Sequence, residues 1–180
     1  MVCKCCNLFT WDCETPQPQF QHYTDEEAKA GGILIYKGRV LIIQSRAEKW
    51  GFPKGGFEPG ETAAQCAERE VREETSFDVG FSEDDLKVRY KSTTLFVKYL
   101  QDEPPKIDIQ YLKTPGNDCT GIGWIRLTCL KKLVKRGKIK KKVNSDILER
   151  LKTLSLDANE EDEVMRFNLG VRKFVKRYMK

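Results

Sequence analysis

Three glutamates lie close together in one short stretch of the chain. Glu70, Glu73 and Glu74 are three and four residues apart, so on a helix their side chains share one face. Like charges at this spacing destabilise a helix, and a cation bound between them would remove the repulsion. Carboxylate oxygens are ligands of hard divalent ions, Mg²⁺ in particular. The spacing therefore predicts a Mg²⁺ or Mn²⁺ site.

The segment before these glutamates is suited to close contact with a ligand. Residues 50–56 read WGFPKGG, and glycines let a backbone approach a bound group closely. Pro59-Gly60 predicts a turn. Thr62 and Gln65 have the spacing of a capping box, which predicts that a helix begins near Thr62 and continues to about Thr75. The positive end of its dipole would point back at the turn.

The run 55–77 resembles the Nudix box, G-x5-E-x7-R-E-U-x-E-E-x-G-U, in which U is a bulky apolar residue. The matching positions are Gly55, Glu61, Arg69, Glu70, Val71, Glu73, Glu74 and Phe77. Ser76 stands where the family has a glycine. A glycine just past a helix end usually adopts the left-handed conformation, so we expect serine there to cost about 1 kcal/mol or to force a different exit.

This resemblance implies an α/β fold, a Nudix-type α/β/α sandwich with a mixed sheet and extra basic C-terminal helices. We expect one domain over residues 1–180, with an N-terminal extension (1–30), a core of sheet and Nudix helix (31–130) and a basic helical part (131–180). The implied reaction is hydrolysis of a nucleoside diphosphate linked to another group. Bound metal ions would neutralise the diphosphate and activate a water for in-line attack.

The resemblance also assigns roles to single residues. Glu73 and Glu74 are the expected principal metal ligands, with Glu70 and the Gly55 carbonyl as further ligands. Arg69 is expected to pair with Glu61 in a structural role. Members often supply one more catalytic carboxylate before the last core strand, and the candidate at that place is Asp118, with Asp102, Glu103 and Asp108 as alternatives.

The loop around Trp50 and Lys54 is similar to that of mRNA-decapping Nudix enzymes, in which the lysine would contact a phosphate. Trp50 is a second substrate-binding candidate, although a core position is the alternative for it. Diadenosine tetraphosphate hydrolases share much of this loop, and diphosphoinositol polyphosphate phosphohydrolases share the box and the need for basic surface. A Nudix-fold RNA-binding protein without catalysis is the third hypothesis. The candidates for an aromatic that stacks on a cap are Trp11, Phe20, Tyr23 and Tyr178.

Charge is divided unevenly along the chain. Residues 131–180 hold 16 Lys and Arg against 7 Asp and Glu, a net charge of +9, whereas residues 1–130 carry −4. The candidate substrate-binding residues of the basic part are Lys131, Lys132, Lys135 and Arg136, and a second basic stretch covers 172–178. Such tracts indicate capped RNA or another phosphate-rich polyanion as partner. The alternative is a solvated helix face or a nuclear-localisation-like run.

The cysteines and the hydropathy indicate an intracellular protein. Seven cysteines, an odd number, favour reduced thiols over a disulfide framework. Zinc binding by Cys3, Cys5, Cys6 and Cys13 with His22 is an alternative whose spacing fits no common zinc motif. No apolar stretch approaches 18 residues, so we expect no membrane partner and a cytoplasmic or nuclear location.

Hydrophobic periodicity predicts the other elements. A hairpin is expected from strands 31–36 and 40–44 around Lys37-Gly38-Arg39. Residues 86–100 are expected to form one long strand, 107–112 a second and 122–127 a third. Helices are expected near 130–136, 145–154 and 162–178.

Overall fold

The computed structural model describes residues 6–11, 27–45, 49–113, 117, 119–142 and 165–179, and for 136–142 it describes the backbone alone. Its strands are β1 (Asn7–Thr10), β2 (Lys29–Tyr36), β3 (Arg39–Ser45), β4 (Lys49–Gly51), β5 (Lys54–Gly56), β6 (Lys87–Tyr90), β7 (Thr93–Tyr99), β8 (Cys119–Arg126) and β9 (Arg166–Phe167). Its helices are α1 (Ala63–Thr75), α2 (Ile109–Leu112), α3 (Leu127–Lys142) and α5 (Leu169–Tyr178).

The strands of the described part form one mixed sheet in the order β1-β8-β3-β2-β7-β6. β2 and β7 pair in parallel, as do β4 and β9, and the other pairs are antiparallel. β5 pairs with β2, and β4 with β3. The first hairpin turns at Lys37 and Gly38, both at positive φ, as a tight two-residue turn requires. The predicted hairpin is therefore confirmed.

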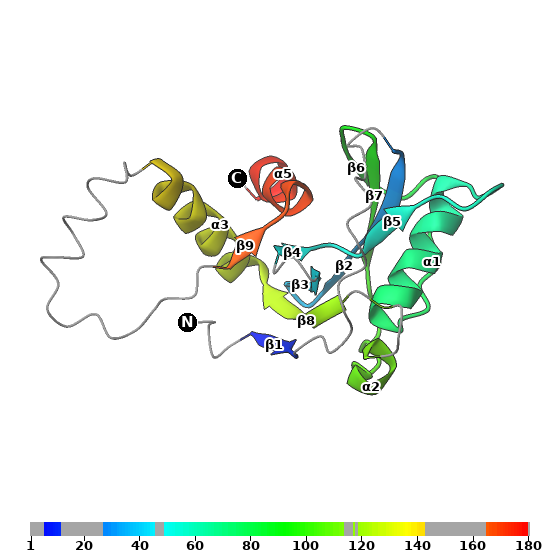
Figure 1. Ribbon diagram of the computed structural model, residues 1–180, viewed down its shortest axis with the longest axis horizontal. Coiled ribbons are helices and arrows are strands. Elements are labelled where there is room, and N and C mark those ends of the chain that lie inside the picture. The colour runs from blue at the N-terminus through cyan, green and yellow to red at the C-terminus, as the bar shows by residue number, and fades with distance from the viewer. Residues whose placement is uncertain are drawn as a thin grey trace, which may run out of the picture.

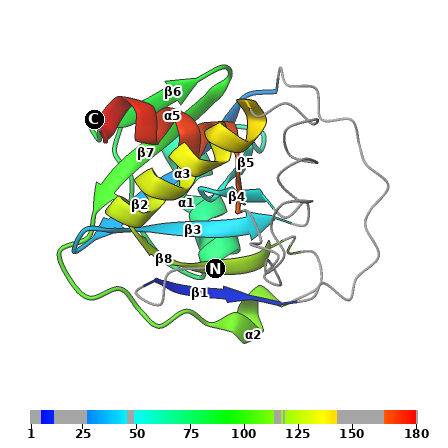
Figure 2. The same cartoon turned by 90° about the vertical axis from the view of Figure 1, so that its left-hand side faces the viewer.

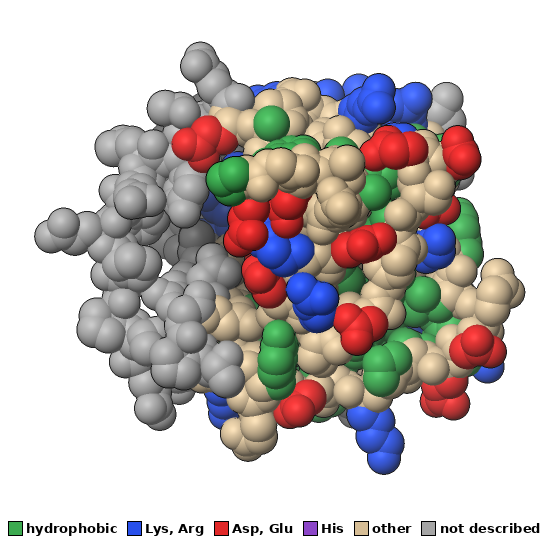
Figure 3. All heavy atoms as spheres, turned by 90° about the vertical axis from the view of Figure 1, so that its right-hand side faces the viewer, with side chains coloured by type: hydrophobic (Ala, Val, Ile, Leu, Met, Phe, Trp, Pro, Cys, Tyr) green, Lys and Arg blue, Asp and Glu red, His purple; other side chains and the backbone are tan. Residues whose placement is uncertain are grey.

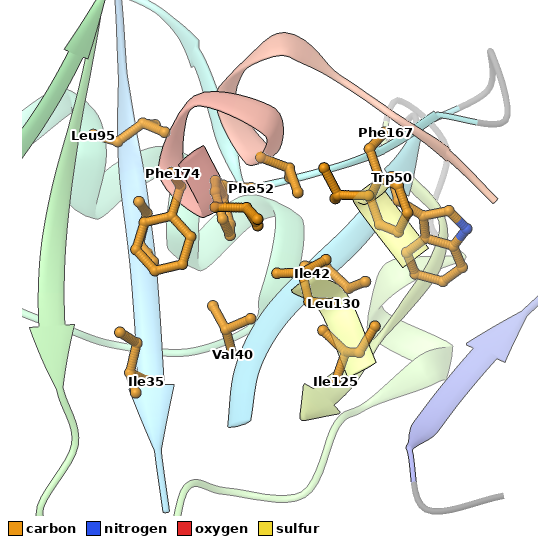
Figure 4. Packing of buried hydrophobic residues seen from close by; sticks show 14 of the residues in the cluster. Ile35, Val40, Ile42, Trp50, Phe52, Leu95, Ile125, Leu130, Phe167 and Phe174 are labelled. Carbon is orange, nitrogen blue, oxygen red and sulfur yellow. The ribbon is translucent and has the colours of Figure 1, made fainter. Parts of the chain in front are cut away.

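Helices cover both faces of the sheet (Figures 1 and 2). α1 and α2 pack on one face, and α3 and α5 lie together on the other. The central strands are buried on both sides, with Ile33 and Ile35 of β2 in the cluster beneath α3 and α5, and Leu34 in the cluster beneath α1. Figure 4 shows the first cluster, where aliphatic side chains of the strands meet aromatic side chains of α5 and β9. The α/β/α sandwich expected from the sequence is confirmed.

Residues 86–100 form a hairpin and not one long strand. Tyr90 pairs with Thr93 across a two-residue turn in which Lys91 has a φ of 48°. The apolar alternation shifts by one residue at the turn, because Val88 of β6 and Leu95 of β7 are an odd number of residues apart but lie in the same core cluster. The turn residues give no signal of the hairpin, since Lys91-Ser92 contains neither glycine nor proline.

Two further expectations were wrong. Residues 109–112 form the short helix α2, because the Asp108 carboxylate accepts hydrogen bonds from the backbone N–H groups of Gln110 and Tyr111, as an N-cap does. The last helix begins at Leu169, capped by Asn168, and β9 takes up part of the range expected to be helical.

The other expected elements are present with shifted bounds or lie outside the description. The strand expected over 122–127 begins at Cys119, and the helix expected over 130–136 begins at Leu127. Residues 145–154 lie outside the described residues. Within the described part no helix is long and apolar enough to cross a membrane.

Candidate active site

The loop between β4 and α1 lies across the N-terminal end of β2. Gly31, Ala30 and Lys29 pair in order with Lys54, Gly55 and Gly56, and the Gly32 N–H donates to the Pro53 carbonyl at 3.0 Å. A Cβ on Gly31 would lie 2.1 Å from the Pro53 oxygen. Only glycine at position 31 therefore lets the loop approach so closely.

The helix that carries the glutamates is capped at both ends. At its start the Thr62 N–H donates to Gln65 Oε1 at 2.9 Å, and the Gln65 N–H donates to Thr62 Oγ1 at 3.3 Å, so the predicted capping box is present. At its end Ser76 adopts the left-handed conformation with a φ of 63°, and its N–H donates to the Arg72 carbonyl. Serine thus keeps the exit that a glycine would give, at an expected cost in backbone strain.

Arg69 joins the loop to the helix. Its Nε and Nη2 donate to the two carboxylate oxygens of Glu61 at 2.7 and 3.1 Å, and Nη2 also donates to the Gly56 carbonyl at 2.7 Å. This two-point pairing lowers the pKa of Glu61 to about 2, chiefly through the hydrogen bond from Arg69. The contact expected between Arg69 and Glu61 is therefore present, and it holds the turn before α1 against the helix.

The Glu70 and Glu74 carboxylates lie beside the Lys54–Gly55 segment, and Arg69 connects Glu70 to Glu73. Arg69 Nη1 contacts Glu70 Oε1 at 2.8 Å and Glu73 Oε2 at 3.2 Å, so these two carboxylates already share one cation. Glu74 Oε2 accepts a hydrogen bond from the Lys54 N–H at 2.7 Å. Asp and Glu side chains gather around Lys and Arg on the face of the molecule that carries α1 and β5 (Figure 3).

Gly55 has no room for a side chain. A Cβ there would lie 2.1–2.3 Å from the carboxylate atoms of Glu70, so the glycine backbone lies directly against this carboxylate. Burial raises the pKa of the Glu70 carboxyl, and the adjacent Arg69 acts in the opposite direction. A second cation beside Glu70 would favour its ionised form.

The donor set fits a divalent metal ion in its chemistry. Carboxylate oxygens of Glu70, Glu73 and Glu74 and a backbone carbonyl at Gly55 are the hard oxygen ligands that Mg²⁺ and Mn²⁺ take. No three acidic, histidine or cysteine side chains of the described residues stand at ready-made ligand spacing. Two of these carboxylates instead engage the guanidinium of Arg69, and the Glu73 side chain, 52% exposed, has room to turn.

Two residues of this region have no counterpart in the sequence prediction. The buried Cys66 thiol donates to the Gly56 carbonyl at 3.3 Å, and burial raises its pKa to about 11, so the thiol stays protonated. The Asn117 amide donates to the Glu73 carbonyl at 3.0 Å and accepts from the Cys119 N–H at 2.9 Å. Only the Pro-Gly-Asn-Asp turn sequence marks Asn117, and a turn sequence does not name a distant partner.

Trp50 was wrongly predicted to contact substrate. Its side chain is 4% exposed and belongs to the core cluster beneath α3 and α5 (Figure 4). Lys54 is half-buried, and its charge acts on Glu70, which places the ammonium near the carboxylates.

The remaining candidates are distributed over other parts of the molecule. Asp118, Phe20 and Tyr23 lie outside the described residues, as do Cys3, Cys5, Cys13 and His22. Asp102 and Glu103 are exposed, whereas Asp108 is occupied as the cap of α2. Trp11 packs against the core, and Tyr178 stacks on Phe174. The described cysteines, Cys6, Cys66, Cys119 and Cys129, are free thiols.

The basic residues lie on the face of the sheet opposite α1. Lys132 and Lys135 of α3 are exposed and Lys131 is half-buried, while the side chain of Arg136 lies outside the description. The exposed basic residues of α5 are Arg172, Lys173, Lys176 and Arg177. We refer to the exposed basic residues of α3 and α5 together as the basic layer.

Comparisons with known proteins find relatives of this chain. Residues 27–143 match the family model described as NUDIX domain. The chain is 31% identical over 128 residues to protein 111R of Invertebrate iridescent virus 3, covering 69% of this chain and 75% of that protein. It is 27% identical over 132 residues to the m7GpppN-mRNA hydrolase dcap-2 of Caenorhabditis elegans, covering 69% of this chain but 17% of dcap-2.

An RNA pyrophosphohydrolase of Legionella pneumophila is 35% identical to this chain over 106 residues, covering 57% of this chain and 54% of that enzyme.

Proposed function

The chain belongs to the Nudix family, and from this premise we propose that it is a metal-dependent hydrolase of the triphosphate bridge of capped RNA, releasing 7-methylguanosine diphosphate. One observation carries the proposal: Glu70 and Glu74 of α1 lie against the Lys54–Gly55 segment, on the other side of the sheet from a basic layer. The first feature is suited to a diphosphate and the second to a long polyanion.

The residues of the site would have the following roles. Glu70, Glu73, Glu74 and the Gly55 carbonyl would hold Mg²⁺ or Mn²⁺, which supplies charge neutralisation and a more acidic water when bound. Lys54 would contact a phosphate. A carboxylate that is not engaged with the ion would accept the proton of the attacking water. Water adds to phosphorus, one P–O bond of the bridge breaks, and the RNA leaves with a 5′-monophosphate.

The basic layer would bind the body of the RNA. Lys and Arg that neutralise phosphates release counterions, so this part of the binding free energy weakens as salt rises. The relative named m7GpppN-mRNA hydrolase supports a capped RNA as substrate.

A second candidate is favoured by the relative named RNA pyrophosphohydrolase. In this case the substrate would be a pyrophosphate at the 5′ end of RNA without a cap. The same carboxylates would hold the metal ion, and the basic layer would bind the RNA. Diphosphoinositol polyphosphates and dinucleoside polyphosphates remain alternatives in which the basic layer binds a compact anion. A non-catalytic RNA-binding role is the further alternative.

A substrate panel with Mg²⁺ or Mn²⁺ tests the proposal. The panel contains capped RNA tens of nucleotides long, the cap dinucleotide, 5′-triphosphorylated RNA, diadenosine tetraphosphate and a diphosphoinositol polyphosphate. We expect capped RNA to be cleaved fastest, with a lead over the cap dinucleotide that shrinks as salt is added. Equal, salt-insensitive rates on the two capped substrates would contradict decapping, and faster cleavage of another substrate would identify the alternative.

A further inference from the structure

The strand β4 leads into the loop that carries Lys54 and Gly55, which we call the catalytic loop. β9 and α5 support this strand. β9 pairs in parallel with β4, with Trp50 opposite Phe167, and the Asn168 N–H donates to the Trp50 carbonyl at 2.9 Å. The Phe52 ring meets the Phe174 ring edge to face, with centroids 5.5 Å apart (Figure 4). All of this support comes from residues beyond the stretch 27–143 that matches the family.

Asn168 makes the tightest of these contacts, on Gly51. A Cβ on Gly51 would lie 2.0 Å from Asn168 Nδ2, so glycine at position 51 leaves the room that the amide occupies. Its φ lies outside the left-handed region, so the need for glycine is one of space and not of backbone conformation. Asn168 is fixed from its other side, because its Oδ1 accepts a hydrogen bond from the Val171 N–H at 3.1 Å.

Only a few residues separate this contact from the candidate metal ligands. Pro53 is bound to Gly32, Lys54 to Glu74, and Gly55 lies against the Glu70 carboxylate. A displacement of Gly51 therefore reaches these ligands within four residues of chain. β4 and β5 are three residues long each, so the loop has few hydrogen bonds of its own to absorb such a displacement.

We propose that β9 and the start of α5 form a positioning element for the catalytic loop, and that Asn168 is its positioning residue. The inference rests on the proposed metal binding by Glu70, Glu73, Glu74 and the Gly55 carbonyl. It implies that the matched family domain is catalytically incomplete in this chain without residues 166–174. It also implies that α5, which carries four of the six residues of the basic layer, helps to support the loop through its first residues.

A suppression experiment in the full-length chain tests this inference. Gly51→Ala introduces the clash, and Asn168→Ser removes the amide while keeping an oxygen that caps α5. We expect Gly51→Ala to lower kcat by about tenfold to a hundredfold, as a misplacement near 1 Å can, and to weaken Mn²⁺ binding. The kcat and the Mn²⁺ affinity of the double variant should lie within about threefold of those of Asn168→Ser, because the two residues share one contact.

Two readouts keep this test separate from the proposed substrate. Titration calorimetry with Mn²⁺ alone measures the ligand geometry without any substrate, and kcat and KM are measured on whichever panel substrate the wild type cleaves fastest. If the proposed decapping activity is wrong, the Mn²⁺ affinities still test the positioning role. The positioning role is overturned if Gly51→Ala binds Mn²⁺ like the wild type, or if the double variant binds Mn²⁺ as weakly as Gly51→Ala alone.

Asp85→Ala is the control for a general loss of stability. It removes the carboxylate that accepts a hydrogen bond from the Ser82 N–H and pairs with Lys98, in the turn before β6 and without contact to the loop. We expect a lower melting temperature with unchanged Mn²⁺ affinity. If Asp85→Ala weakens Mn²⁺ binding as much as Gly51→Ala does, the effect is one of stability and the inference is wrong.

Discussion

We expect the removal of the Glu73 and Glu74 carboxylates to separate catalysis from RNA binding. Glu73→Gln with Glu74→Gln removes two negative charges and leaves the side-chain shapes nearly unchanged. We expect Mn²⁺ binding to be lost and hydrolysis to fall by at least about a hundredfold, while RNA affinity stays close to that of the wild type. Calorimetry, the substrate panel and an RNA-binding assay measure the three quantities.

Glu68→Gln is a matched control on the same helix. Glu68 accepts a hydrogen bond from the Phe81 N–H at 2.7 Å, and the glutamine oxygen can accept it too. Its activity should match the wild type. A wild-type protein without activity on any diphosphate would favour the non-catalytic alternative.

Glu61 should make stability depend on acid pH. Its folded pKa is lowered to about 2 from 4.5, so its pairing with Arg69 stabilises the fold above about pH 4.5 and is lost as the pH falls towards 2. Glu61→Gln should therefore cost about 1–3 kcal/mol near neutral pH. The difference in free energy of unfolding between Glu61→Gln and the wild type should shrink as the pH falls from about 4.5 towards 2. Urea unfolding at several pH values measures it, and a difference that is constant from neutral pH to pH 2 would contradict the assignment.

At the scale of elements, the exit of α1 offers a stabilising substitution. Ser76 has a φ of 63°, a conformation that glycine adopts without steric cost. Ser76→Gly should raise the free energy of unfolding by about 1 kcal/mol, as measured by urea denaturation. Lys91→Gly, at a φ of 48° in the β6–β7 turn, should give a similar gain. A loss of stability in Ser76→Gly would show that the serine side chain makes a contact that outweighs the strain.

Asn117 connects β8 to the last turn of α1. Asn117→Ala removes the hydrogen bond to the Glu73 carbonyl and the one from Cys119, so we expect a loss of about 1–2 kcal/mol and faster hydrogen exchange at the C-terminal end of the helix. Asn117→Asp keeps the acceptor for Cys119 but not the donor to Glu73. If Asn117→Asp is as stable as the wild type, the bond to Glu73 contributes nothing.

The parts of the fold that sequence could predict are those with local causes. The capping box at Thr62 and Gln65, the Lys37-Gly38 hairpin and the pairing of Arg69 with Glu61 each depend on residues close in sequence or fixed by the Nudix box. The turn at Lys91-Ser92 carries no glycine or proline, so the strand was predicted too long. Trp50 was misassigned because its burial depends on β9, more than 100 residues away, and no local pattern marks this pairing.

At the scale of the whole molecule, the sheet separates the candidate metal site from the basic layer. Lys132→Glu with Lys135→Glu should weaken the binding of an RNA tens of nucleotides long and reduce the slope of log K against log salt by about 1.4, if each lysine contacts one phosphate of a single strand. Fluorescence anisotropy at several salt concentrations measures the slope. Lys106→Glu, at an exposed site ahead of α2, makes half of this change in charge away from the basic layer and should leave the slope unaltered.

The parallel pairing of β4 with β9 has a consequence during protein synthesis. Position 50 leaves the ribosome 117 residues ahead of position 167, which corresponds to roughly 6–23 seconds of translation. For most of that interval the emerged polypeptide contains every glutamate of α1 but lacks the strand that pairs with the outer edge of β4. If β9 positions the loop, hydrolytic competence should appear only after residues 166–174 have left the ribosome.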